Sequence, residues 1–364
     1  MAGELNVDLG ERSYKIHCGS GLLPVAGSIL LNLNLAAPCL VVSNATVAGH
    51  YWPVLEQSLK TAGFQPHLAL VPDGEEAKTL QVAASLYDSA LAAGIERRAA
   101  VIALGGGVVG DVAGFIAATW LRGVPFIQVP TTLLAQVDSS VGGKVAVNHP
   151  GGKNLIGAFY QPLAVIADLD TLATLPPREI RAGLAEVIKY GVIGDAGFFA
   201  YLEEHLEGAL AGDKEVLETI VLRSCAMKAA VVARDERESG LRAVLNFGHT
   251  VGHAVEAVTG FTAYRHGEAV AMGMVAAARL AVRRGMFSME ETGRLVRLLA
   301  RAGLPVTLPD LDPATFQAAL GHDKKVRQGQ LRMVLPERLG RVQVISVSIE
   351  EVMAQVFEKG FIRL

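Results

Sequence analysis

The chain has 364 residues, 51% of them hydrophobic, and a formal net charge of −3. This composition indicates a well-cored globular protein, and the length favours two domains. The charge gives no support for nucleic acid binding. The N-terminus lacks the apolar core of a signal peptide, and the apolar runs are interrupted before membrane-spanning length, so we expect no membrane partner. Because the three cysteines (Cys18, Cys39 and Cys225) also lack metal-like spacing, we expect a cytoplasmic protein in a reducing compartment.

The first half of the chain alternates short apolar runs with amphipathic stretches. The opening segments 4–10 and 13–19 alternate by two and predict an antiparallel pair of strands. Buried parallel strands are predicted further on, at residues 39–43, 67–71, 99–104, 125–129 and 164–168. Helical patterns lie between several of these runs, so the alternation predicts an α/β fold around a parallel sheet.

Helical periodicity dominates after residues 174–179, which read "TLPPRE". The pair Pro176-Pro177 cannot sit inside a helix and therefore marks a boundary. We expect an α/β domain at residues 1–177 and a mainly α-helical domain at residues 178–364. The pattern at residues 331–347 allows a short hairpin in the second domain.

A glycine-rich loop follows one of the predicted strands and opens a predicted helix. Gly105, Gly107 and Gly110 stand in a G-x-G-x-x-G frame, where bare backbone lets a pyrophosphate approach the helix N-terminus. The alternative is that the glycines serve tight strand–helix packing. The loop also departs from the usual dinucleotide fingerprint, because it follows the third or fourth strand and no acidic residue follows a strand about 20 residues later.

Two pairs of charged residues stand in unusual settings. Lys144 and Lys153 each follow a Gly-Gly pair, so we expect loops to hold them and to aim them at an anion; a solvated turn is the alternative. Glu186 and Lys189 lie one turn apart in an otherwise apolar helix. They form either a surface ion pair or a pair that lies against a cleft.

Three histidines raise the question of a metal site. His249 and His253 stand four residues apart on a predicted helix and therefore share a face. Glu186, His249 and His266 could supply two nitrogens and one oxygen to an ion with an open fourth position, as in catalytic zinc sites. His253 could equally be a ligand, and a helical histidine is also often an ordinary core or surface residue.

Several longer motifs, taken together, resemble the 3-dehydroquinate synthase family. They cover about residues 70 to 325 in the family's order, which makes them far more specific than the glycine loop alone. The motifs are "PDGEEAKTL", "GGGVVGDVAGFIAATWLRG", "VPTTLLAQVDSSVGGKVAVNHPGGKNLIGAFYQP", "TLPPREIRAGLAEVIKYG", "DERESGLRAVLNFGHTVGHAVE", "HGEAVAMGM" and "HDKK".

The resemblance implies a Rossmann-like NAD-binding N-terminal domain and a C-terminal domain that binds metal and substrate, with NAD in the cleft between them. It implies that Glu186, His249 and His266 bind Zn²⁺ or Co²⁺, and that His253 contacts the substrate. The implied NAD contacts are Asn44, Glu75, Lys78, Gly106, Gly107, Asp111, Thr131, Thr132, Leu134, Asp138, Lys144, Lys153 and Thr174. Many members of the family carry Asp at the position of Asn44, and Asn can still hydrogen-bond the ribose hydroxyls.

The implied reaction is the conversion of 3-deoxy-arabino-heptulosonate 7-phosphate to 3-dehydroquinate and phosphate, a shikimate-pathway step of aromatic amino acid biosynthesis. It runs through transient oxidation at C5, phosphate loss, re-reduction, ring opening and aldol closure, so that NAD is regenerated. In this family the substrate phosphate is thought to remove the C6 proton, and the protein mainly supplies cations.

The implied catalytic and substrate contacts are Asp138, Lys144, Lys153, Asn154, Lys189, Lys228, Arg242, Asn246 and His253, with Lys324 or the adjacent Lys325. Arg122 matches a residue that reaches the neighbouring subunit's site, so a homodimer is expected.

Three alternatives stay open. Another sugar phosphate cyclase, acting on glucose 6-phosphate or sedoheptulose 7-phosphate, would share the fold and cofactors, but those substrates lack the carboxylate that the many cations here favour. A metal-dependent polyol dehydrogenase would consume NAD stoichiometrically, and the Gly-Gly-Lys triplets and Arg242 would have no obvious role in it. A non-catalytic homologue would have lost ligands, and none of the three proposed ligands is missing.

Overall fold

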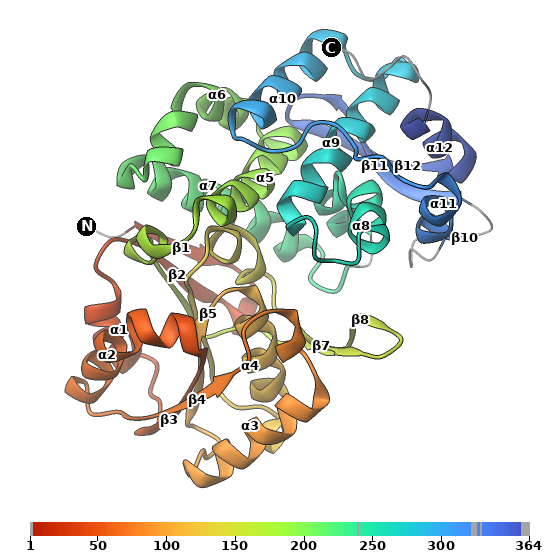
Figure 1. The fold of residues 1–364 in the computed structure, drawn as a ribbon. Coiled ribbons are helices and arrows are strands. Elements are labelled where there is room, and N and C mark those ends of the chain that lie inside the picture. The colour runs from red at the N-terminus through yellow and green to blue at the C-terminus, as the bar shows by residue number, and fades with distance from the viewer. Residues whose placement is uncertain (1–2, 239, 322–325, 328–329, 358–364) are drawn as a thin grey trace. The chain divides into compact units, whose positions relative to one another are not determined.

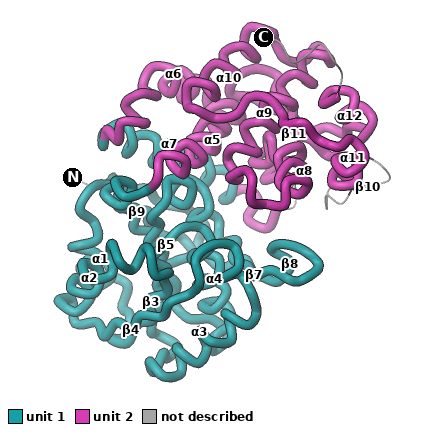
Figure 2. Tube along the Cα trace, in the orientation of Figure 1, with its two compact units in different colours: residues 1–175, 214–233 teal, residues 176–213, 234–364 magenta. Residues whose placement is uncertain are grey.

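A computed structural model describes residues 3–238, 240–321, 326–327 and 330–357 (Figure 1). The chain forms two compact units (Figure 2): unit 1 comprises residues 1–175 and 214–233, and unit 2 comprises residues 176–213 and 234–364. The boundary predicted after Pro177 falls close to the first of these divisions, whereas residues 214–233 count with unit 1. The assignment of NAD to one segment and of metal and substrate to the other stays a prediction.

The described part of unit 1 contains a seven-stranded sheet in the order β1-β2-β9-β6-β5-β3-β4. Its strands are β1 (Gly3–Val7), β2 (Tyr14–Gly19), β3 (Pro38–Asn44), β4 (Gln65–Val71), β5 (Ala100–Gly105), β6 (Phe126–Pro130) and β9 (Ala164–Asp168). β1 and β2 pair antiparallel, and the other pairs are parallel. The predicted opening pair and the predicted parallel strands are therefore confirmed.

Helices cover both faces of this sheet. They are α1 (Ala26–Leu31), α2 (Ala45–Thr61), α3 (Leu80–Ala92), α4 (Gly107–Thr119) and α7 (Lys214–Arg234), of which the last residue belongs to unit 2. Successive residues of β3 point to opposite faces. Leu40 and Val42 enter a core with side chains of α3 and α4, and Cys39 and Val41 enter a core with α1 and α2.

A two-stranded hairpin follows the sheet strand β6 in sequence, with β7 (Lys144–His149) pairing antiparallel to β8 (Gly152–Phe159). The prediction that loops hold Lys144 and Lys153 is therefore wrong, because both lie in strands. The physical reason is the alternation in "KVAVNH", which buries Val145 and Val147 against the core that contains α4. Both lysine side chains remain exposed.

Unit 2 is mainly helical, as expected. Its helices are α5 (Pro177–Gly194), α6 (Ala196–Ala211), α8 (His249–Val258), α9 (His266–Arg283), α10 (Met289–Arg301), α11 (Pro313–Gly321) and α12 (Ile349–Phe357). The described residues add a three-stranded antiparallel sheet of β10 (Val326–Arg327), β11 (Gln330–Arg338) and β12 (Arg341–Ser348), which includes the hairpin that the sequence allowed. Pro177 begins α5, a position that proline tolerates because its missing N–H has no partner there.

Helix α9 is nearly all buried and packs closely on its neighbours through glycine. A Cβ on Gly273 would lie 1.9 Å from the carbonyl oxygen of Gly248, just before α8, and a Cβ on Gly267 would lie 1.9 Å from the carbonyl oxygen of Ala182 in α5. These approaches place the start of α8 against the middle of α9, and the start of α9 against α5. No helix in the described residues combines the length and the apolar character needed to span a bilayer.

Candidate active site

The glycine loop joins β5 to α4 in unit 1, as the sequence predicts. Gly105 ends the strand and α4 begins at Gly107, so that the free N–H groups of a helix N-terminus follow bare backbone. A Cβ on Gly106 would lie 3.1 Å from Thr132 Cγ2, and one on Gly107 would lie 3.0 Å from Ser139 Oγ. Packing is a further reason for glycine, because a Cβ on Gly110 would lie 2.8 Å from a side-chain oxygen of Gln128.

The hydroxyl-rich segment after β6 lies against this loop. The backbone N–H of Thr131 donates to the Gly105 carbonyl at 3.0 Å, and the Thr132 hydroxyl accepts from Ala135 N at 3.1 Å. Thr131 Oγ1 is buried with no hydrogen-bond partner among the described residues. Leu134 directly precedes the π-helix η5 (Ala135–Ser139), a distortion that is frequent at functional sites. This segment therefore offers an unused polar atom beside the glycines.

Lys78 organises a polar network from several predicted NAD and substrate contacts. Its buried ammonium lies 2.6 Å from Asp111 Oδ2, contacts Asn154 Oδ1, and lies 3.7 Å from Glu75 Oε1. Asn148 closes the network: its amide donates to Glu75 at 2.8 Å and its oxygen accepts from Asn154 N at 2.8 Å. Burial raises the pKa of Asp111, and the charge of Lys78 opposes that rise. Four of the predicted residues thus meet in unit 1.

A second buried lysine of unit 1, Lys228, comes from helix α7. Its ammonium lies 2.8 Å from the carboxylate of Asp138 and donates to the backbone carbonyl of Asp138 at 2.6 Å. Lys228 is 6% exposed, so this pairing removes most of the cost of burying its charge. The two residues were predicted separately as substrate contacts, and the fold places them together.

In unit 2, α5, α8 and α9 bring the proposed metal ligands into one cluster. Oε1 of the fully buried Glu186 lies 3.6 Å from Nε2 of His249 and 3.7 Å from Nε2 of His266. The ring of His253 lies 5.3 Å from that of His249 and 5.8 Å from that of His266, between centroids. The three imidazoles could hold a metal ion together.

The other nitrogens of two rings are already engaged. Nδ1 of His249 lies 3.0 Å from the Phe247 carbonyl, and Nδ1 of His266 lies 3.3 Å from Glu256 Oε2. Such partners fix the ring orientation and leave Nε2 to bind a metal, an arrangement usual around metal-ligating histidines. Both Nε2 atoms are directed to the same oxygen of Glu186, which fits a ligand set of Glu186, His249 and His266.

The electrostatics of the cluster also fit a cation. No described residue donates a hydrogen bond to Glu186 Oε1, which is an orphaned buried oxygen; Lys189, itself 1% exposed, pairs with Oε2. The alternative of a surface ion pair is therefore excluded. Burial, followed by the charge of Lys189, holds the pKa of His249 well below its ordinary value, so its ring is neutral, as metal binding requires. Burial would lower the pKa of His266, but the hydrogen bond and charge of Glu256 outweigh it and raise the pKa.

Arg242 is held just before the metal cluster in sequence, in the 3₁₀ helix η7 (Leu241–Asn246). It is 2% exposed; its backbone N–H donates to Asp235 Oδ2 at 2.9 Å and its guanidinium to the Glu236 carbonyl at 2.7 Å. Asn246 ends the same turn and is partly exposed. Lys324 and Lys325 lie outside the described residues.

The remaining predicted residues lie elsewhere in unit 1. Asn44 caps α2, its Oδ1 accepting from Val47 N at 2.8 Å, and Thr174 contacts the hydroxyl of Tyr51. Lys144 and Lys153 are exposed on the hairpin. Arg122 is exposed and has a φ of 70°, in the left-handed region that few non-glycine residues adopt.

Sequence reasoning missed three supporting residues: Asn148, Asp235 and Glu256. Glu256 could have been found, because it stands seven residues after His249 and three after His253 on one helix face. Asp235 accepts from backbone N–H groups across a loop, and Asn148 bonds the Glu75 side chain and the Asn154 backbone; spacing gives no signal for either.

Solved structures of sugar phosphate cyclases match nearly the whole chain. 2-Deoxy-scyllo-inosose synthase complexed with carbaglucose-6-phosphate, NAD⁺ and Co²⁺ matches with a TM-score of 0.88 and 28% identity, over 97% of this chain and 99% of that one. 2-Epi-5-epi-valiolone synthase from Streptomyces hygroscopicus subsp. jinggangensis, with NAD⁺ and Zn²⁺ bound, matches with a TM-score of 0.86 and 31% identity, over 94% and 95%. The α/β unit with its glycine loop and the helical unit with its carboxylate and imidazoles define a protein of this class.

Sequence comparison narrows the class to one family. The model of the 3-dehydroquinate synthase N-terminal region matches residues 68–182, and that of the C-terminal region matches residues 183–326. The 3-dehydroquinate synthase of Pelotomaculum thermopropionicum is 55% identical over 358 residues, which are 98% of this chain and 96% of that protein. The chain belongs to the 3-dehydroquinate synthase family.

Proposed function

We propose that this protein converts 3-deoxy-arabino-heptulosonate 7-phosphate to 3-dehydroquinate and phosphate, with NAD and a divalent metal as cofactors. The observation that carries the proposal is the 55% identity to a 3-dehydroquinate synthase along 98% of the chain. The convergence of His249 Nε2 and His266 Nε2 on a buried oxygen of Glu186 supports it, because the cluster has the donor set of a catalytic metal site.

Glu186, His249 and His266 are the proposed ligands of Zn²⁺ or Co²⁺, and the donor set suits either ion. When bound, the metal would supply Lewis acidity toward a substrate hydroxyl, and NAD would supply a hydride acceptor. Glu256 and the Phe247 carbonyl hold the two imidazole rings in the tautomer and orientation that present Nε2. His253, exposed beside the cluster, is the proposed substrate contact.

We propose that the glycine loop and the segment after β6 receive NAD. The N–H groups that open α4 would hydrogen-bond the pyrophosphate, and the buried, unpartnered hydroxyl of Thr131 would find an acceptor or donor there. The network of Glu75, Lys78 and Asp111 fixes these side chains before any ligand arrives. The proposed NAD contacts are Asn44, Glu75, Lys78, Gly106, Gly107, Asp111, Thr131, Thr132, Leu134, Asp138, Lys144, Lys153 and Thr174.

The chain's cations would hold the two anionic ends of the substrate. Phosphate and carboxylate need point charges or guanidinium forks, and Lys228 and Arg242 offer these from buried, oriented positions. The full proposed set for substrate is Asp138, Lys144, Lys153, Asn154, Lys189, Lys228, Arg242, Asn246, His253 and Lys324, with Arg122 given by a second subunit of a homodimer. A cytoplasmic location is part of the same proposal.

Another sugar phosphate cyclase activity is the second candidate, because the synthase complexed with carbaglucose-6-phosphate shares the fold. The identity to that synthase is 28%, against 55% to the 3-dehydroquinate synthase, so the sequence favours the carboxylate-bearing substrate.

The test is turnover of the purified protein with Zn²⁺, 3-deoxy-arabino-heptulosonate 7-phosphate and NAD. The NAD concentration is kept at about a tenth of the substrate concentration or less, so that repeated use of each NAD can be measured. Phosphate release and product identity are measured, and glucose 6-phosphate and sedoheptulose 7-phosphate run in parallel. Many turnovers per NAD with the first substrate alone support the proposal. Turnover of a sugar phosphate without a carboxylate, and none with the first substrate, overturns it.

A further inference from the structure

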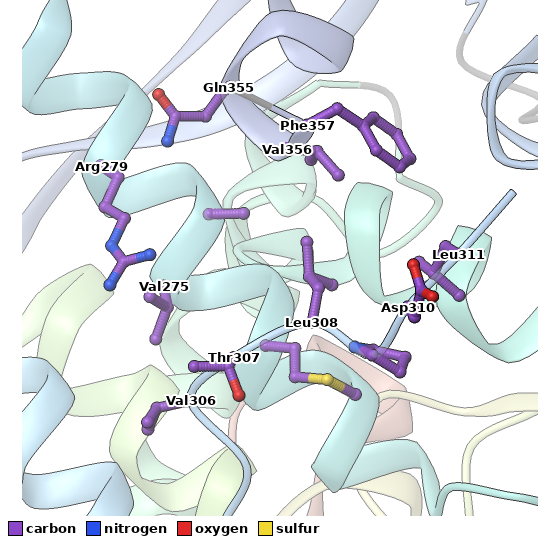
Figure 3. Close-up of a pocket in the computed structure, with 13 residues that line it drawn as sticks. Val275, Arg279, Val306, Thr307, Leu308, Asp310, Leu311, Gln355, Val356 and Phe357 are labelled. Carbon is purple, nitrogen blue, oxygen red and sulfur yellow. The ribbon is translucent and has the colours of Figure 1, made fainter. Parts of the chain in front are cut away.

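A cavity lies within unit 2, between the latter part of α9, the segment before α11 and the end of α12 (Figure 3). Its volume is about 320 Å³. Most of the lining is apolar and includes Met272, Val275, Leu308 and Phe357. None of its lining residues is a proposed metal, NAD or substrate contact, so the function proposed above does not account for it.

Arg279 is the notable member of the lining. It is 9% exposed, yet it makes no ion pair or hydrogen bond with any described residue, and its Nε is buried without an acceptor. A buried guanidinium is normally paired, because desolvation of an unpaired charge is costly. Burial accordingly lowers the pKa of Arg279. The cavity is therefore lined by a positive charge that forms no ion pair with any described acid, including Asp310 of the same lining.

Neighbouring arginines show the contrast. Arg284, also near the end of α9, donates to Glu351 at 2.6 Å, and Arg294 on α10 donates to Glu203 at 3.0 Å. These side chains are satisfied within the protein. Arg279, the arginine that lines the cavity, forms no such pair with a described acid.

Gln355 adds a second buried polar group to the same wall. It is 6% exposed and lines the cavity from α12, and its Oε1 accepts from Arg283 at 3.5 Å. That bond directs the oxygen toward Arg283, so the amide nitrogen is the group that Gln355 can offer to a ligand. Arg279 thus supplies a charged donor and the Gln355 amide nitrogen a neutral one, and an anion needs such donors.

We propose that this cavity binds a small organic monocarboxylate with an apolar body. Its carboxylate would take two parallel hydrogen bonds from Arg279 and one from Gln355, and its body would pack on Met272, Leu308 and Phe357. One guanidinium balances one negative charge. The carboxylate of Asp310 also lines the cavity and disfavours a ligand with more negative charge, such as a phosphate dianion.

The cavity is separate from the proposed metal site along α9. His266 begins this helix, and Arg279 lies in its last turns, about 20 Å further along the axis at a rise of 1.5 Å per residue. Met272, the cavity residue closest to His266 in sequence, is about 9 Å along the same axis. Occupancy of the cavity would therefore be an event on the helix that presents His266, without contact between the ligand and His266.

The test is isothermal titration calorimetry of the full chain with 3-phenylpropanoate, compared with 3-phenylpropan-1-ol as its neutral counterpart. The variant Arg279→Gln removes the charge, and Ala276→Leu keeps the charge but fills the cavity. Arg297→Gln is the matched control, because Arg297 is an exposed arginine of α10 that does not line the cavity. Arg242→Gln reports on binding at the proposed active site.

We expect one binding site for the acid, with the alcohol, Arg279→Gln and Ala276→Leu each weaker by roughly tenfold or more, the effect of one charge-assisted pair or of lost volume. Arg297→Gln and Arg242→Gln should bind as the unchanged protein does. Equal binding of acid and alcohol, or binding that survives both cavity variants, overturns the proposal. Loss of binding in Arg242→Gln alone places the acid in the active site and also overturns it.

Discussion

Glu186 lies fully buried with its Oε1 3.6 Å from Nε2 of His249. A buried carboxylate oxygen that accepts no hydrogen bond from the described residues is costly, and a neutral imidazole does not offset the cost. A bound metal cation would offset it. The cost is therefore best understood as part of a binding site, and it sets the first three predictions.

Glu186→Gln should lower bound metal from about one ion per chain to a small fraction after dialysis, because the amide keeps the shape but loses the charge. Metal content is measured by elemental analysis, together with activity. Glu204→Gln makes the same change on an exposed side chain of α6 and should retain metal. Normal metal content in Glu186→Gln would remove Glu186 from the ligand set.

Glu256→Gln should weaken metal binding by about 10- to 100-fold without abolishing it, the effect usual for a residue that orients a ligand. The carboxylate lies 3.3 Å from Nδ1 of His266 and strengthens that ring as a ligand. Competition with a chelator measures the affinity. An unchanged dissociation constant would show that the contact is structural only.

His249 and His253 should behave differently despite their shared helix face. Nε2 of His249 lies 3.6 Å from Oε1 of the buried Glu186, whereas the side chain of His253 is exposed. His249→Ala should lose metal, and His253→Ala should keep metal and lose roughly 100-fold in kcat/KM, the usual range for a positioned proton-transfer or substrate group. Equal metal loss in both variants would make His253 a ligand.

Much of the fold could be predicted from the sequence, for a physical reason. Buried parallel strands read as continuous apolar runs, and the run at residues 39–43 lies inside β3. The hairpin of β7 and β8 was not predicted, because the Gly-Gly pairs before Lys144 and Lys153 indicate loops. Tertiary packing determines the structure there. A Cβ on Gly114 would lie 2.3 Å from a side-chain carbon of Val145, so β7 packs directly on α4 at this glycine.

The candidate site could be predicted only in part. Spacing places His249 and His253 on one face, but it cannot bring Glu186 and His266 to them from other helices. The residue types allowed that set as one possibility, the resemblance selected it, and the structure supplies the distances. The Lys78 network was out of reach of spacing for the same reason, because Asp111 and Asn154 are far from Lys78 in sequence.

Lys78→Met should destabilise unit 1 by about 1–3 kcal/mol, because it leaves Asp111 partly buried without its cation. The midpoint of chemical unfolding, monitored by circular dichroism, measures the change. Lys60→Met is the matched control: it removes an exposed pair with Glu56 on α2 and should change stability by less than about 0.5 kcal/mol. Equal changes in the free energy of unfolding in the two variants would show that Lys78 does not organise this network.

Gly273→Ala tests whether the contact between α8 and α9 positions the metal ligands. The new Cβ would lie 1.9 Å from the Gly248 carbonyl oxygen, and Gly248 directly precedes His249. A backbone carbonyl cannot move aside as a flexible side chain can, so α9 must move away from α8. We therefore expect the free energy of unfolding to fall by more than about 2 kcal/mol and metal binding to weaken.

The control for this substitution is Gly49→Ala on the exposed face of α2, where a Cβ meets nothing within 4 Å. That change should stabilise the protein by about 0.5–1 kcal/mol, because alanine favours a helix and costs less backbone entropy. Thermal unfolding and chelator competition on both variants separate the two effects. Gly273→Ala with full metal affinity would show that the positions of His249 and His266 do not depend on the close approach of α9 to Gly248.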